Sequence, residues 1–247
     1  MRGAETIKKR NIKKFDNDVK SSGSYNYTQL IKMSAKISNA RISSEIAMAI
    51  NFKEMRVLDL GCGDGAYTVE YALCGALSVL GLDPAKRAVQ AAISRSRAMG
   101  LAERVKFKVG DIYHLNTISL NESFDVIVLR GVLHHLEDPE LAIKTLSDFN
   151  GYIILLEPNG LNPILKILEK VSRYHIEHEE QSFSPKTICN WLKKYDFSIY
   201  RKKLLNCVPM FCPDWIAYCA YFFGPVVERL PVIRELGCGQ VIIVAHR

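Results

Sequence analysis

Alternating blocks of apolar and polar residues run along the middle of the chain and predict strands and helices in turn. Short apolar runs predict strands at residues 56–60, 77–83, 105–109, 124–130 and 152–157. The continuous apolar centre of "FDVIVLR" is typical of a parallel strand that is buried on both faces. Helices are expected between these strands, and Pro84 and Asp138-Pro139 suit the first turns of two of them.

A helical pattern precedes the first strand, from Tyr27 to Ile50. Its apolar positions fall on one side of a helix, which we expect to face the core: Leu30, Met33, Ile37, Ala40 and Ala47.

The second half of the chain is less regular. A helix is expected over 184–195, with Ser184 as its cap, and strands over 197–205 and 240–246. Two segments interrupt this pattern, a polar and mixed insertion at 158–183 and an apolar one at 206–237.

The alternation of strands and helices predicts an α/β fold with an open, doubly wound, mostly parallel sheet of seven strands. The loops that follow the parallel strands then meet at one edge, where such folds bind ligands. We expect a basic flexible tail at 1–24 and a single domain at 25–247, with helices at its N-terminus and an apolar helical insertion before the last strand.

Composition adds limits on partners and compartment. The net charge is +7, and seven basic residues against three acidic ones lie in the first twenty positions, which indicates a solvated arm or contact with phosphate or anionic lipid. Seven scattered cysteines and the lack of an apolar signal segment predict a cytoplasmic protein with reduced thiols. The longest uncharged apolar run, 215–227, is too short to cross a bilayer.

The stretch "VLDLGCGDGAY" places three glycines directly after the first strand. Gly61 to Ala66 fits the relaxed dinucleotide pattern G-x-G-x-x-G/A, but the pattern alone is weak. Asp59 and Asp64 would each oppose a pyrophosphate by roughly 1 kcal/mol. The turn therefore favours a nucleoside that carries positive charges in place of phosphates.

Five stretches in order resemble the motifs of class I S-adenosylmethionine-dependent methyltransferases of the group that modifies small molecules, lipids and glycans. The similarity spans about residues 50–160 and is carried by these stretches: "VLDLGCGDG", "GLDPA", "GDIYHL", "FDVIVLRGVLHHLEDP" and "YIILLEPN". The resemblance implies a sheet that ends with an antiparallel strand, and S-adenosylmethionine as the cofactor.

The resemblance also implies which residues contact the cofactor. Asp59 and the turn would hold the amino acid part, Asp83 the ribose hydroxyls, Asp111 with Ile112 the adenine, and the backbone of Arg130 the amino group. The full set of cofactor residues is Asp59, Gly61, Cys62, Gly63, Asp83, Pro84, Asp111, Ile112 and Arg130.

Several of these residues have alternative interpretations. Asp83 also suits a helix cap and Asp111 a turn, and Cys62 is expected to pack rather than to act as a nucleophile. The charge of Arg130 departs from the family pattern. Its side chain either binds a carboxylate or phosphate of the substrate or faces solvent.

Methyl transfer to oxygen or carbon also needs a base for the acceptor's proton. His134 and His135 follow the fourth strand, and we expect one of them to act. Glu157 and Asn159 follow the fifth strand and are candidate substrate contacts, as are His175 and His178 in the first insertion. The histidine cluster there could also be a metal site or a solvated insertion, and we expect no metal.

The expected function is methylation of a small-molecule or lipid-linked acceptor at oxygen or carbon. The basic arm leaves RNA, tRNA included, as an alternative, and a non-catalytic cofactor-binding protein and a dehydrogenase are more remote. The aromatic residues at 215–223 predict an apolar cover over the acceptor end of the cleft and peripheral contact with a membrane.

Overall fold

A computed structural model describes residues 12–14, 16–17, 19, 25, 28, 32–117, 123–172, 176, 180–209 and 212–247. Seven strands in this part of the chain form one sheet. In spatial order they are β3 (Val105–Val109), β2 (Ser78–Asp83), β1 (Arg56–Leu60), β4 (Val126–Arg130), β5 (Tyr152–Pro158), β7 (Gln240–His246) and β6 (Ser198–Leu205). The first five are parallel, whereas β7 runs antiparallel to both neighbours, so the fold prediction is confirmed.

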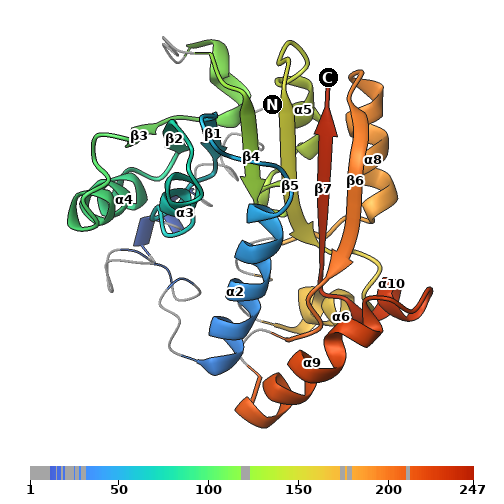
Figure 1. Ribbon diagram of the computed structural model, residues 1–247. Helices are drawn as coiled ribbons and strands as arrows, with labels where there is room; N and C mark the ends of the chain where they lie inside the picture. Colours follow the sequence, from blue (N-terminus) through green and yellow to red (C-terminus); the bar gives the residue numbers. More distant parts are fainter. Residues whose placement is uncertain are drawn as a thin grey trace.

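Helices cover both faces of the sheet (Figure 1). The described α-helices are α2 (Met33–Ala47), α3 (Thr68–Leu73), α4 (Lys86–Ala98), α5 (Pro139–Lys144), α6 (Pro163–Val171), α8 (Pro185–Lys194), α9 (Asp214–Val227) and α10 (Ile233–Gly237). Two 3₁₀ turns, η1 (Ile112–Thr117) and η2 (Leu133–His135), follow β3 and β4.

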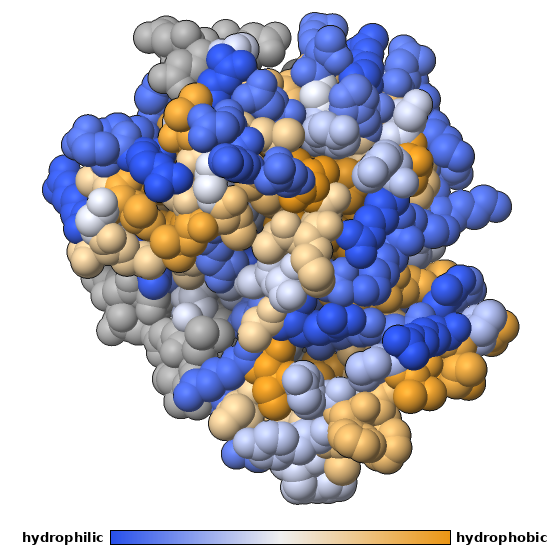
Figure 2. Space-filling view, viewed as in Figure 1, coloured by the Kyte–Doolittle hydropathy of each residue, from blue (hydrophilic) through white to orange (hydrophobic). Residues whose placement is uncertain are grey.

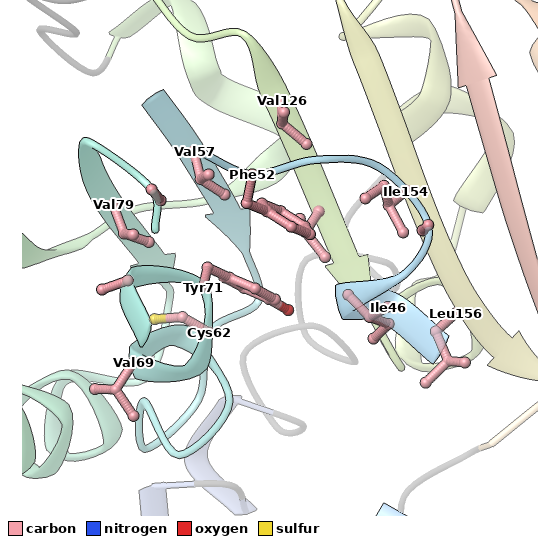
Figure 3. Close-up of a cluster of buried hydrophobic side chains, with 14 of the residues drawn as sticks. Ile46, Phe52, Val57, Cys62, Val69, Tyr71, Val79, Val126, Ile154 and Leu156 are labelled. Atoms are coloured by element: carbon pink, nitrogen blue, oxygen red, sulfur yellow. The ribbon is translucent and has the colours of Figure 1, made fainter. Parts of the chain in front are cut away.

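The core consists of two apolar layers, one on each face of the sheet. Along β5, Ile153 and Leu155 join the layer under α5 and α8, whereas Ile154 and Leu156 join the layer under α2, α3 and α4. Successive side chains of a strand point to opposite faces, so a strand buried on both faces must be apolar throughout. Phe52 and Tyr71 stack within the second of these layers, with their ring centroids 5.6 Å apart (Figure 3).

The boundaries of most helices and strands lie within a few residues of those predicted from caps and apolar runs in the sequence. Asp138 and Ser184 cap α5 and α8 as expected, since their side chains accept hydrogen bonds from Leu141 N and Thr187 N. Inside the first insertion, Asn162 and Pro163 start α6 by the same chemistry.

The predicted inner face of α2 is wrong. Ala40 is exposed and Met33, Ile37 and Ala47 are only half-buried. The buried face includes the polar residues Ser34, Ser38, Asn39 and Glu45. Distant residues satisfy three of these: Asn206 donates to Ser38, Tyr67 to Asn39, and Arg201 and Lys203 pair with Glu45.

The second insertion forms a helical projection at the edge where the parallel strands end (Figure 1). α9 packs on α2, and Arg41 of α2 pairs with Glu228 at 2.6 Å. Apolar surface gathers on this part of the molecule in Figure 2. No helix among the described residues is both long and apolar enough to cross a bilayer.

Described positions within residues 1–24 lie against the domain. Val19 is buried beside Tyr25, Ala85 and Ala88, and Asp16 accepts a hydrogen bond from Arg87 N. The remainder of that segment lies outside the described residues, so its flexibility stays a prediction.

Candidate active site at the ends of the parallel strands

A cavity of about 390 Å³ lies where β1, β2 and β4 end, within the size range of ligand pockets. It is lined by the glycine turn after β1, the loop after β2, the start of η1 and the residues after β4. Ile12, Tyr25 and Thr28 of the N-terminal segment complete the wall.

Eight of the nine predicted cofactor residues line this cavity: Gly61, Cys62, Gly63, Asp83, Pro84, Asp111, Ile112 and Arg130. Asp59 is not among the residues that line it. Its carboxylate is buried and accepts a hydrogen bond from Thr68 Oγ1 at 2.6 Å, so it fixes the start of α3. Burial raises the pKa of Asp59 to about 7.

The glycine turn has the backbone geometry that its composition predicts. Gly61 and Gly63 have φ angles of +76° and +53°, which other residues rarely adopt. A Cβ atom on Gly61 would lie 2.6 Å from Val132 Cγ2, and one on Gly63 would lie 2.9 Å from the Tyr25 ring. The turn therefore permits a close approach between β1, the segment after β4 and the N-terminal segment.

Asp83 lies at the end of β2 and ties the glycine turn to the next loop. Its Oδ2 accepts from Gly63 N at 2.9 Å and its Oδ1 accepts from Ala85 N at 2.8 Å. Burial raises its pKa to about 6, although both hydrogen bonds favour the carboxylate. Asp83 thus holds the turn and the next loop together. Its carboxylate also lines the cavity, with a raised affinity for a proton.

Asp64 does not supply free negative charge to the cavity, which corrects the interpretation of the turn. Its Oδ2 pairs with Arg95 Nη2 at 3.2 Å and accepts from Thr28 Oγ1 at 2.6 Å. Tyr25 N also donates to this carboxylate. Asp64 therefore fastens the N-terminal segment and α4 to the turn.

Cys62 is a packing residue. Its side chain is buried between the two glycines, and burial raises the pKa of its thiol well above the ordinary value. A protonated, buried thiol is not a nucleophile.

Arg130 neither faces solvent nor has all its donors satisfied within the protein. Its side chain is 6% exposed, and its guanidinium carbon lies 3.4 Å from the centroid of the Tyr67 ring. Nη1 donates to Ser43 Oγ at 3.0 Å and to Glu70 Oε2 at 3.3 Å, whereas Nη2 is buried without a hydrogen-bond partner.

The two adjacent histidines have different surroundings. His134 is buried, and its Nδ1 lies 2.8 Å from Glu157 Oε2. Burial opposes the charged ring, but the attraction and hydrogen bond of Glu157 outweigh it and raise the pKa of His134. His135 lines the cavity, and its ring lies against that of His134, with centroids 3.9 Å apart and planes tilted by 43°.

Glu157 and Asn159, the predicted substrate contacts after β5, do not line the cavity. Glu157 accepts from the backbone N–H groups of Val132, Leu133 and His134, which fixes η2. Asn159 is buried and donates to the carbonyls of Glu235 and Cys238. Both side chains therefore hold loops together, which argues against the predicted substrate contacts.

His175 and His178, the other candidate substrate contacts, lie outside the described residues. Among the residues that the structure describes, His134, His135 and Glu180 each bring one possible ligand atom within 4.8 Å of the others. Such a set could hold a cation, and the prediction that no metal binds stays a prediction.

Several residues that line the cavity were not predicted from the sequence. Tyr67, Tyr113 and Gln181 line it, together with Thr28 from the N-terminal segment. Tyr67 lies two residues after the last glycine of the turn, but no spacing rule pairs it with Arg130. Among the described residues that line the cavity, none belongs to 206–237, and the predicted cover over the acceptor end of the cleft stays a prediction.

Comparisons with known proteins agree with this geometry. A family profile described as a methyltransferase domain matches residues 51–212. The ubiquinone biosynthesis O-methyltransferase of Rhizobium etli is 31% identical over 193 residues, which cover 76% of this chain and 72% of that protein. The protein of the same name from Actinobacillus pleuropneumoniae is 25% identical over 187 residues, with coverage of 75% and 77%.

Solved structures share the fold. Magnesium protoporphyrin IX methyltransferase from Synechocystis PCC 6803, crystallised with bound SAM, aligns with a TM-score of 0.63 and 15% identity over 96% of this chain and 97% of that chain. Geranyl diphosphate methyltransferase in complex with SAM aligns with a TM-score of 0.60 and 15% identity, covering 87% and 85%. At these identities the likeness concerns the fold alone.

Proposed function

Since this chain belongs to the S-adenosylmethionine-dependent methyltransferases, we propose that it methylates a hydroxyl oxygen of a small acceptor with an apolar tail. The observation that carries the proposal is the cavity at the ends of the parallel strands, where eight residues implied by the cofactor motifs meet.

The residues present fit S-adenosylmethionine. The glycines of the turn leave room for close backbone contact, and the carboxylate of Asp83 suits two ribose hydroxyls. Asp111 and Ile112, which follow β3 and line the cavity, suit an adenine, by hydrogen bonding and by apolar contact respectively. When bound, the cofactor supplies a methyl group that is already activated by its sulfonium.

His135 is the better candidate for the base. It lines the cavity, whereas the Nδ1 of its neighbour His134 is engaged by buried Glu157. In the proposed reaction His135 accepts the acceptor's hydroxyl proton while the methyl group passes from sulfur to oxygen. The proton then leaves to water, and S-adenosylhomocysteine is the second product.

Oxygen as the acceptor atom and an apolar tail are supported by two observations. Curated relatives carry the name ubiquinone biosynthesis O-methyltransferase. The chain also exposes five aromatic side chains on α9, outside the cavity but at the same edge of the sheet: Trp215, Tyr218, Tyr221, Phe222 and Phe223. No observation in the described residues favours RNA over such an acceptor.

The exposed face of α9 also supports peripheral contact with an anionic membrane. No charged residue lies between Trp215 and Val227, and α6 exposes Ile164, Ile167 and Val171. Exposed Arg229 and Arg234 follow on the C-terminal side. Aromatic residues next to basic ones are typical of helices that lie at a lipid interface.

Methyl transfer is tested with S-adenosylmethionine labelled on its methyl group and a lipid extract as the source of acceptors. We expect label to enter the organic phase. His135→Gln should lower the rate by about 10²–10⁴-fold and leave S-adenosylhomocysteine affinity unchanged. Label only in the aqueous phase would exclude the apolar acceptor, and full turnover by His135→Gln would exclude this base.

Membrane contact is tested by flotation with anionic and with zwitterionic vesicles. We expect binding to anionic vesicles that weakens with salt, with deletion of residues 1–20, and with Trp215→Ser. Tyr200→Ser is the matched control, because Tyr200 on β6 is 69% exposed, as is Trp215. Equal flotation of both variants, or none of the wild type at low salt, would remove the membrane proposal.

A further inference from the structure

Arg130 is a buried cation at the wall of the cofactor cavity. It ends β4, and its side chain is 6% exposed. No other arginine or lysine is found among the described residues that line this cavity. An anionic group inside the cavity therefore has one strong cationic partner available.

The guanidinium is held in a fixed orientation by its neighbours. It stacks on the Tyr67 ring, and its Nη1 is shared between Ser43 Oγ and Glu70 Oε2. These contacts use one terminal nitrogen. The other, Nη2, is buried without a hydrogen-bond partner, although such donors are almost always satisfied in proteins.

None of the described carboxylates near Arg130 forms a short, fully buried ion pair with its guanidinium. Glu70 lies at 3.3 Å and is 36% exposed, so this pair is long and partly solvated. Asp59 is buried and its raised pKa weakens its charge near neutrality. Asp64 is engaged by Arg95, and Asp83 by two backbone N–H groups.

We propose that Nη2 of Arg130 binds a carboxylate inside the cavity, and that this carboxylate belongs to the methionine part of the cofactor. The proposal rests on the proposed function, because it places the cofactor in this cavity. Val132, two residues after Arg130, packs against Gly61, so Arg130 belongs to the wall nearest the glycine turn. The motifs assign the amino acid part to that turn and the nucleoside to Asp83 and Asp111.

The acceptor is the other source of a carboxylate. A fixed guanidinium would recognise either one by the same charge-assisted hydrogen bonds. The test therefore separates the two sources.

Calorimetry with the full chain compares S-adenosylhomocysteine with its decarboxylated analogue, which keeps the amine. We expect the wild type to bind S-adenosylhomocysteine at least tenfold more tightly than the analogue. Arg130→Met should remove this difference because it weakens the binding of S-adenosylhomocysteine and not that of the analogue. Arg130→Lys should restore part of the difference. Arg97→Met removes an exposed charge on α4 and is the matched control.

If Arg130 had only a structural role, Arg130→Met would weaken the binding of both ligands equally. Equal affinity of the wild type for the two ligands excludes the cofactor's carboxylate as the partner of Arg130. The second arm then titrates the S-adenosylhomocysteine complex with benzoate as the carboxylate probe. Benzoate binding that is lost in Arg130→Met supports the acceptor as the source. No dependence on Arg130 in either arm overturns the proposal. A wild type that binds neither nucleoside contradicts the proposed function instead.

Discussion

Glu157 of β5 and His134 of η2 form a buried ion pair, with Oε2 and Nδ1 2.8 Å apart. The three backbone N–H groups of residues 132–134 donate to Glu157. The pair therefore holds η2 in place and fixes the ring of His134, against which the ring of His135 lies. Its strength depends on the charge of His134.

The first prediction concerns pH and stability. The pKa of His134 is raised in the folded protein, so its ionic contribution is fully present below the ordinary histidine value of about 6.5. The contribution is lost as pH rises through the raised folded value. His134→Gln should therefore cost about 1–3 kcal/mol near pH 6 and less near pH 9.

Urea unfolding of wild type and variant at both pH values measures this difference. His114→Gln is the control, because His114 is mostly exposed in η1. An equal loss of stability at both pH values would show that His134 acts by packing alone.

The second prediction concerns Asp83. Asp83→Asn keeps the shape of the side chain but only one oxygen acceptor, so the charge is lost together with one of the two backbone hydrogen bonds, from Gly63 N or Ala85 N. Two charge-assisted hydrogen bonds to the ribose would weaken, and we expect a loss of about 1.5–3 kcal/mol in binding, which is roughly 10–150-fold. Calorimetry with S-adenosylhomocysteine measures it, and wild-type affinity in the variant would contradict the ribose assignment.

The third prediction concerns the pH dependence of binding. Ribose hydroxyls donate to the carboxylate form of Asp83, so binding should lower its pKa, which is about 6 in the free protein. Affinity should then rise from pH 5 to about pH 7 and level off, with proton release on binding.

Calorimetry in two buffers of different ionisation enthalpy detects those protons. Asp83→Asn should remove most of the pH dependence. If the slope persists unchanged in the variant, another group, such as Asp59 with its pKa of about 7, is responsible.

The fourth prediction separates backbone strain from steric contact in the glycine turn. Gly61→Ala and Gly100→Ala both place an alanine at positive φ, +76° and +69°. Only the first brings a Cβ to 2.6 Å from Val132, since nothing lies within 4 Å of one on Gly100. Both variants should lose about 1–2 kcal/mol of stability through strain, and Gly61→Ala more.

Cofactor affinity should fall for Gly61→Ala and stay unchanged for Gly100→Ala. Thermal unfolding and calorimetry give the two readouts. Equal behaviour of both variants would mean that close contact at Gly61 has no part in binding.

The sequence by itself determined the sheet and the edge of the sheet at which the cavity lies. β1, β4 and β5 are buried on both faces, so their apolar runs stand out without knowledge of any neighbour. The caps at Asp138 and Ser184 act within three residues, and chain direction alone brings the loops after parallel strands to one edge.

The tertiary structure alone decided how the polar side chains are used. Glu45 lies on the buried face of α2, where Arg41 of the same helix pairs with it together with Arg201 and Lys203 of β6, which are more than 150 residues away in the chain. Asp64 is engaged by Arg95, and only His135 of the adjacent histidines lines the cavity. A polar group can be buried when its partner is present, and no local pattern in the sequence specifies a partner from a distant element.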